Sequence, residues 1–292
     1  MMADHNLFEK AHALQQEGRY IEALDAYTQA IEVGLDEANA YHRRADTYLL
    51  LGLYQEAIRD YGRAIELSVG DQELYIDRAY SLCCVADYEE AIQDCSKVIT
   101  LHPDDARAYI VRGSAYGLAS RPELAVKDFN RALELSAEDA EIYYNRGLAR
   151  FLLGDFEDAL KDYDKAIELD PRFAHVYYNR GVLYQRKGRY HEAIENYRAA
   201  LDLGLHLPEV YCNRGTAYAK LGKYQLATSD FDAALDLHPQ NRDIYYYRAI
   251  AHLVLGNIGQ ALEDMRTAAG LGHEKATDFL NDHGLSLQET IH

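Results

Sequence analysis

Cysteine, basic residues and long apolar runs are all scarce in this 292-residue chain. Its four cysteines, Cys83, Cys84, Cys95 and Cys212, form no Cys-x-x-Cys pair, so nothing supports a zinc knuckle or a thioredoxin-type motif. No stretch approaches the roughly eighteen apolar residues of a membrane span. The first residues also lack the basic region and the apolar stretch of a secretory signal. These absences predict a cytoplasmic protein with reduced thiols.

The balance of charge and the missing motifs exclude further classes. There are 30 Lys and Arg residues against 48 Asp and Glu residues, which gives a formal net charge of -18. Such a surface repels phosphates and argues against broad nucleic-acid binding. The sequence contains neither a Gly-x-Ser-x-Gly elbow nor a glycine-rich phosphate loop, and its histidines do not follow a zinc-protease spacing. We therefore expect no enzyme activity, no cofactor, no metal site and no membrane partner.

The chain has instead a period of 34 residues. Eight units fit between Asp4 and Lys275 without an insertion or a deletion. Counted from Asp4, position 8 is always Gly or Ala, position 24 is large and mostly aromatic, and position 20 never varies: Ala23, Ala57, Ala91, Ala125, Ala159, Ala193, Ala227 and Ala261. Small residues leave room for a facing aromatic ring where two helices cross closely. The period therefore predicts a repeated helix crossing.

Each unit is predicted to form two helices. In the fifth unit, apolar residues recur at helical spacing up to Leu153, Gly154 interrupts them, and a second amphipathic run ends before Pro171. Six units have Gly in this turn, whereas Ser120 and Pro122 predict a different turn in the fourth. The predicted units are 4–37, 38–71, 72–105, 106–139, 140–173, 174–207, 208–241 and 242–275, followed by a capping helix at 276–284 and a tail at 285–292.

In these positions the chain resembles the tetratricopeptide repeat family, whose units share the 34-residue length and the order of aromatic, small, Ala and Pro positions. The chain departs from the family in having Tyr where Trp is usual and in keeping only three of the closing prolines. The resemblance implies an all-α fold, a right-handed α-solenoid (superhelix) of eight helix-turn-helix units with a C-terminal capping helix. It also implies that first helices line a concave groove that holds a peptide or protein segment.

A second departure is a basic residue at position 7. Seven units carry Arg there: Arg44, Arg78, Arg112, Arg146, Arg180, Arg214 and Arg248. Sixteen residues later stand Asp60, Asp94, Asp128, Asp162, Asn196, Asp230 and Asp264, and the first unit lacks both members. Paired presence predicts an ion pair between helices, within one unit or across to a neighbour, with contact to a ligand as the alternative.

The groove positions of the family carry no Lys and Asn carboxylate clamp here, which disfavours an adaptor for chaperone tails. They carry apolar and aromatic residues in the middle of the chain and Asn in units five to seven, and an amide both donates to and accepts from an extended backbone. The candidate peptide-binding residues are Ile76, Tyr80, Ile110, Tyr144, Asn145, Tyr178, Asn179, Gln185, Arg186, Asn213, Lys220 and Tyr246.

The predicted function is a non-enzymatic interaction scaffold or adaptor that binds a peptide, a helix or a partner segment in the groove. The alternative is a structural scaffold that self-assembles into homo-oligomers through its ends or its tail.

Overall fold

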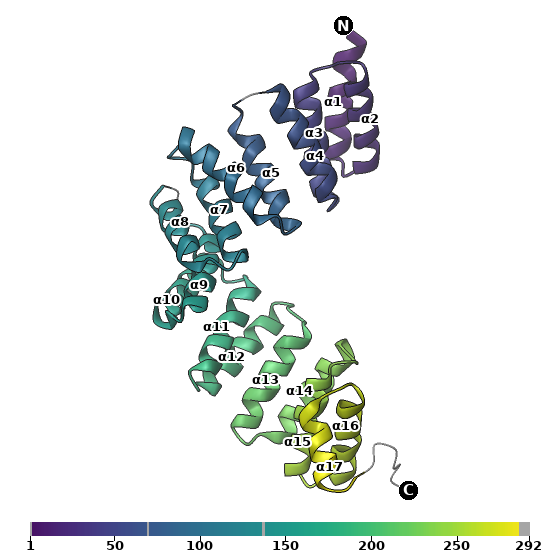
Figure 1. Cartoon of the computed structure of the whole chain (residues 1–292), viewed down its shortest axis with the longest axis vertical. Helices are drawn as coiled ribbons and strands as arrows, with labels where there is room; N and C mark the ends of the chain where they lie inside the picture. Colours follow the sequence, from purple (N-terminus) through teal and green to yellow (C-terminus); the bar gives the residue numbers. More distant parts are fainter. Residues whose placement is uncertain (1, 69, 136–137, 286–292) are drawn as a thin grey trace. The chain divides into compact units, whose positions relative to one another are not determined.

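The computed structural model describes residues 2–68, 70–135 and 138–285, and it describes side chains from residue 7 onward. Seventeen α-helices occur in this part of the chain (Figure 1). They fall into two compact units, Met1–Asp155 and Phe156–His292. From here on, these are the first and the second unit, and each 34-residue period is a repeat. The first unit contains α1 (Met2–Gln16), α2 (Tyr20–Glu32), α3 (Glu37–Leu50), α4 (Tyr54–Leu67), α5 (Gln72–Cys84), α6 (Tyr88–Leu101), α7 (Ala106–Leu118), α8 (Pro122–Leu135) and α9 (Ala140–Leu153). The second contains α10 (Phe156–Leu169), α11 (Ala174–Arg186), α12 (Tyr190–Asp202), α13 (Pro208–Lys220), α14 (Tyr224–Leu237), α15 (Arg242–Val254), α16 (Ile258–Gly270) and α17 (Glu274–Asp282).

The all-helical fold is confirmed, and within each unit consecutive helices pack against one another. None of the described helices combines the length and the hydropathy that crossing a bilayer requires. At the end of the second unit, α17 packs on the preceding helices through Ala276 and Leu280, where the sequence predicts a cap. The predicted tail lies outside the described residues beyond Leu285.

The turns between paired helices share one backbone conformation. In the fourth repeat Ser120 has a φ of 58°, and in the third Ala86 has a φ of 63°, so both adopt the left-handed conformation found at Gly154 and Gly222 in the same turn. The predicted different turn at Ser120 is therefore wrong, because packing of the two helices imposes the left-handed conformation on whichever residue stands there. The other half of that prediction is confirmed, since Pro122 opens α8.

The positions that repeat most strictly form the core. Every alanine at position 20 is fully buried, and the large residues at position 24 are at most 2% exposed: Tyr27, Tyr61, Cys95, Phe129, Tyr163, Tyr197, Phe231 and Met265. A Cβ added at Gly215 would lie 2.9 Å from the ring of Phe231, and one added at Gly181 would lie 2.7 Å from the ring of Tyr197. Glycine is needed here because the first helix touches the aromatic ring through its own backbone.

The predicted ion pair joins the two helices of one repeat. Arg214 donates from Nε and Nη2 to both oxygens of Asp230, at 2.8 and 2.6 Å, and the carboxylate is buried. The same fork links Arg44 to Asp60, Arg78 to Asp94, Arg112 to Asp128, and Arg248 to Asp264, while Arg180 donates to Asn196. Each of these arginines also lies over the tyrosine three residues before it, as Arg214 does over Tyr211 at 5.8 Å.

Several of these arginines also reach the preceding repeat. The Nη1 atom of Arg112 donates to Ser96 on α6 at 3.1 Å, and that of Arg248 donates to Asp232 on α14 at 2.6 Å. The predicted pair of Arg with the Asp sixteen residues later therefore forms within one repeat, and the contact with the preceding repeat is made to a different residue. The arginine thus links the helix that carries it to the second helix of its own repeat and to the second helix of the preceding repeat.

Replacing Asp230 with Ala should lower the free energy of unfolding by about 3–5 kcal/mol, because Arg214 would be left without its buried carboxylate. The control is Glu134→Ala, which removes an exposed partner of Arg131 and should change stability by about 1 kcal/mol at most. Urea unfolding followed by far-UV circular dichroism measures both. Equal stability of the two variants would show that the fork does not hold the helices together.

Candidate peptide-binding surface

An exposed apolar row marks the first helices of the first unit. Tyr80 on α5, Leu118 on α7 and Leu152 on α9 are 52%, 56% and 62% exposed. Leu118 and Leu152 occupy the same position of consecutive repeats, as do Leu50 and Cys84, which are exposed as well. In the first unit, one end of each of four consecutive first helices therefore presents an apolar side chain to solvent.

The candidate residues of the first unit differ in exposure. Ile76 is 2% exposed and packs with Tyr75, Val98 and Ala108, so it belongs to the core and its prediction as a groove contact is wrong. The physical reason is that Ile76 fills space between its own second helix and the next first helix. Ile110 is half-buried against the core of α8 and α9. The remaining candidates are Tyr80, which is exposed, and Tyr144 and Asn145, which are half-buried.

The second unit brings two candidates from neighbouring first helices together. The amide of Asn213 on α13 donates to the hydroxyl of Tyr178 on α11 at 3.2 Å, and Tyr178 rests against the ring of Tyr197. Asn179 donates to the carbonyl of His175 in its own helix at 3.0 Å. One N–H of each of these two amides is therefore used within the protein.

Three further candidates lie at helix ends or beside α17. Arg186 and Lys220 are exposed in the last turns of α11 and α13. Tyr246 on α15 stacks on His273, with ring centroids 4.3 Å apart and an interplanar angle of 19°. Both rings border a cavity of about 420 Å³ that is also lined by Arg242 and Asp243.

The comparisons with known proteins decide the family. Two models described as "Tetratricopeptide repeat" match residues 8–71 and 172–245, and one described as "TPR repeat" matches residues 121–154 and 147–188. Together they cover more than half of the chain. This chain belongs to the tetratricopeptide repeat (TPR) family.

Solved TPR structures share the fold. A tetratricopeptide repeat protein from Parabacteroides merdae is 18% identical with a TM-score of 0.69, and the match covers 86% of this chain and 99% of that one. The Cut9–Hcn1 structure is 19% identical with a TM-score of 0.66 and covers 97% of this chain, which spans 55% of the length of that one. YrrB, described as a TPR protein with an unusual peptide-binding site, is 25% identical with a TM-score of 0.51, and the match covers 61% of this chain and 92% of that one. The comparison with curated proteins found no match.

Gln185 has an internal role in this TPR chain that the sequence analysis did not foresee. The hydroxyl of the fully buried Tyr197 donates to its side-chain oxygen at 2.9 Å. In the first repeat Gln15, at the same position, accepts from Tyr27 at 3.1 Å. Burial raises the pKa of Tyr27 to about 12 and raises that of Tyr197 as well, so both hydroxyls stay protonated and can donate. Gln185 therefore supports the helix crossing beneath the candidate surface.

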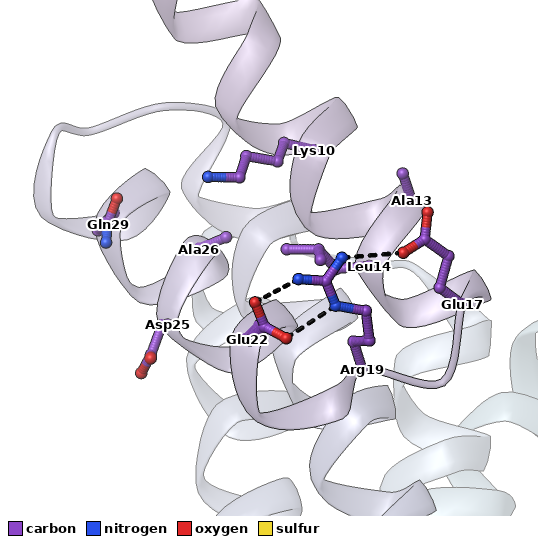
Figure 2. Close-up of a pocket in the computed structure, with 9 residues that line it drawn as sticks. All are labelled: Lys10, Ala13, Leu14, Glu17, Arg19, Glu22, Asp25, Ala26 and Gln29. Atoms are coloured by element: carbon purple, nitrogen blue, oxygen red, sulfur yellow. Dashed lines mark hydrogen bonds and ion pairs between the residues drawn. The ribbon is translucent and has the colours of Figure 1, made fainter.

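A cavity of about 460 Å³ lies between α1 and α2, the two helices of the first repeat (Figure 2). Arg19 lies at one side of it and donates to Glu22 at 2.7 and 2.5 Å and to Glu17 at 3.1 Å. These groups are exposed ion pairs, which contribute little to stability. Because Arg19, Glu17 and Glu22 already pair with one another, this cavity is a weaker candidate for ligand binding than the apolar row.

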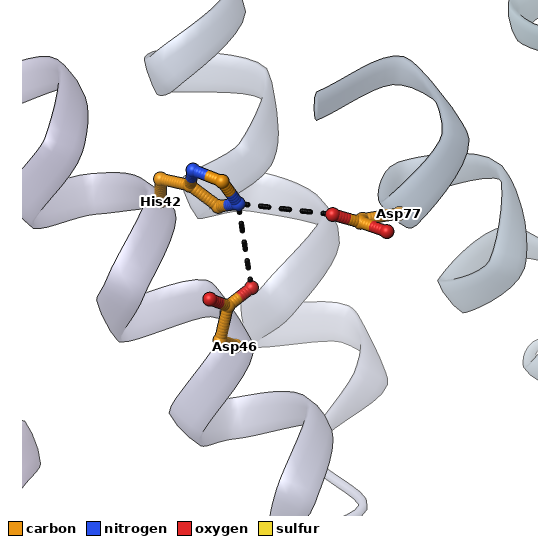
Figure 3. Close-up of side chains that lie close together, drawn as sticks. All are labelled: His42, Asp46 and Asp77. Atoms are coloured by element: carbon orange, nitrogen blue, oxygen red, sulfur yellow. Dashed lines mark ion pairs between the residues drawn. The ribbon is translucent and has the colours of Figure 1, made fainter. Parts of the chain in front are cut away.

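A second feature that the repeat pattern did not predict is a polar cluster on two first helices, α3 and α5 (Figure 3). His42 on α3 is 8% exposed, and its Nε2 lies 3.6 Å from Asp46 Oδ1, one turn later, and 3.7 Å from Asp77 Oδ2 on α5. Burial lowers the pKa of His42, but the nearby carboxylates of Asp77 and Asp46 outweigh burial and raise the pKa. The spacing of His42 and Asp46 along one helix was visible in the sequence, whereas Asp77 comes from the next repeat.

Replacing Gln185 with Ala should destabilise the protein by about 1–3 kcal/mol, because the buried hydroxyl of Tyr197 loses its acceptor. Combining Gln185→Leu with Tyr197→Phe should restore most of this loss, since neither polar partner then remains. Thermal unfolding of the single and double variants measures the effect. If the double variant is no more stable than Gln185→Ala, the contact between Gln185 and Tyr197 is not the source of the loss.

Proposed function

We propose that this TPR protein is a non-enzymatic scaffold whose first unit binds an amphipathic helix of a partner protein. The observation that carries the proposal is the exposed apolar row of Leu50, Tyr80, Cys84, Leu118 and Leu152. Exposed apolar side chains that recur on successive helices are typical of a surface that contacts another protein. An amphipathic helix offers aliphatic anchors at a repeating spacing, which suits a row of apolar side chains carried by successive helices.

The charge of the chain favours a basic partner. With a net charge of -18, the protein attracts segments that carry Lys or Arg beside their apolar anchors, and it repels acidic ones. Electrostatic attraction of this kind speeds association and falls with salt. The missing carboxylate clamp agrees with this proposal, because an acidic tail has no basic site of that type to enter.

Each unit also carries its own further candidates for peptide contact. In the first unit these are Tyr144, Asn145 and the half-buried Ile110. In the second unit they are Tyr178, Asn179, Arg186, Asn213, Lys220 and Tyr246, together with Gln185, which accepts a hydrogen bond from Tyr197. YrrB, described as a TPR protein with an unusual peptide-binding site, supports peptide binding as a use of this fold. The free thiols Cys83, Cys84, Cys95 and Cys212 fit the proposed location in the reducing cytoplasm.

A peptide-display selection on the full chain tests the proposal. We expect selected peptides to carry aliphatic residues at helical spacing together with basic residues. The variant Tyr80→Ser, Leu118→Ser, Leu152→Ser should weaken their binding at least about tenfold, which corresponds to roughly 1.4 kcal/mol. Fluorescence anisotropy at low and high salt measures affinity.

The matched control replaces exposed leucines at the ends of second helices, in Leu67→Ser, Leu101→Ser, Leu237→Ser. It removes comparable apolar surface from outside the row and should leave peptide affinity unchanged. Selected peptides that lose affinity equally for both triple variants, or that keep full affinity for the row variant, would contradict the proposed surface.

A further inference from the structure

The cluster of His42, Asp46 and Asp77 has the composition and geometry of a divalent metal site. Their ligand atoms, one imidazole nitrogen and two carboxylate oxygens, all lie within 4.8 Å of one another (Figure 3). Among the residues that the structure describes, this is the group of His, Cys, Asp and Glu side chains that meets this criterion. We propose that it binds one zinc-class transition metal ion.

The two distances between the imidazole and the carboxylates are close to those around a tetrahedral ion. With metal–ligand bonds of about 2.0–2.1 Å, neighbouring ligand atoms are about 3.3–3.4 Å apart. The Nε2 of His42 lies 3.6 Å from Asp46 Oδ1 and 3.7 Å from Asp77 Oδ2. A cation between the carboxylates removes their mutual repulsion and draws the ligand atoms, which lie within 4.8 Å of one another, toward this spacing.

Neighbouring side chains orient each carboxylate toward the imidazole. Arg43 pairs with Asp46 Oδ2 at 3.1 Å, and Arg107 donates to Asp77 Oδ1 at 3.0 Å. The hydroxyl of Tyr61 donates to Asp46 Oδ1 at 2.8 Å. The arginines thus hold the outer oxygens, and the inner oxygens, Asp46 Oδ1 and Asp77 Oδ2, face His42. Such supporting contacts fix the orientation of metal ligands in proteins.

The donor set selects the kind of metal. An imidazole nitrogen suits Zn²⁺, Co²⁺ or Ni²⁺, whereas Mg²⁺ and Ca²⁺ prefer oxygen ligands alone. Three protein ligands on a tetrahedral ion also provide a place for a fourth, a water molecule or a group from a partner. Because the ligands come from α3 and α5, a bound ion would join the first helices of two consecutive repeats. This site stands independently of the proposed helix-binding row.

Isothermal titration of the full chain with ZnCl₂, after treatment with a chelator, tests the site. We expect one Zn²⁺ per chain, no comparable binding of MgCl₂, and at least about a tenfold loss of Zn²⁺ affinity in His42→Gln and in Asp77→Asn. The control His191→Gln changes an exposed histidine of the second unit and should leave affinity unchanged. No Zn²⁺ binding by the unmodified chain, or equal affinity in all variants, would overturn the proposal.

A second measurement on the unmodified chain makes the result independent of whether the variants fold. Substoichiometric Co²⁺ should broaden the backbone NMR signals around residues 42–46 and 77 before any others, because paramagnetic broadening falls steeply with distance. Broadening that begins instead around His191 or another exposed histidine would assign the metal to an adventitious site and overturn the proposal.

Discussion

The close crossing of two helices within each repeat is the constraint on which the rest of the structure depends. A small residue of the first helix lies against a large residue of the second, and at Gly215 and Gly181 the ring leaves no room for a side chain. This contact fixes which face of the first helix is buried. Other positions of the first helices are then free to vary, and they carry the apolar row and the His42 cluster, in which Asp46 accepts a hydrogen bond from the core residue Tyr61. Core and candidate sites thus share the same helices but not the same positions.

The arginine fork makes the crossing specific in orientation as well as close. Its planar guanidinium holds both oxygens of the partner carboxylate, lies over a tyrosine of its own helix and, in several repeats, reaches the preceding second helix. A bidentate pair accepts only a narrow range of geometries, so one residue type sets the angle within a repeat and the register to the next. This explains why Arg and Asp occur together and why both are absent from the first repeat. The fork belongs to the fold, although it lies next to the candidate surface.

The repeat period predicted the core well, because burial at positions 20 and 24 follows from helix geometry alone and recurs in every repeat. Predictions that depended on a particular neighbour were poorer. Ile76 is buried because the first helix of the next repeat covers it. The side chain of Gln185 is used within the protein because it accepts a hydrogen bond from the buried hydroxyl of Tyr197. Ser120 takes a left-handed turn against its own preference because helix packing dictates the turn. The cluster at His42 includes Asp77 from the next repeat, and a pattern within one repeat cannot reveal a contact between two repeats.

Backbone contact at the crossing, rather than helix propensity, sets the stability of each repeat. Urea unfolding of Gly215→Val, compared with Thr216→Val one position along the same helix, tests this most directly. Gly215→Val should lose about 1–3 kcal/mol of unfolding free energy because its new methyl groups meet the ring of Phe231. Thr216→Val, which places the same residue at a half-buried position, should change stability by about 0.5 kcal/mol or less. Equal stability of the two variants would contradict the account.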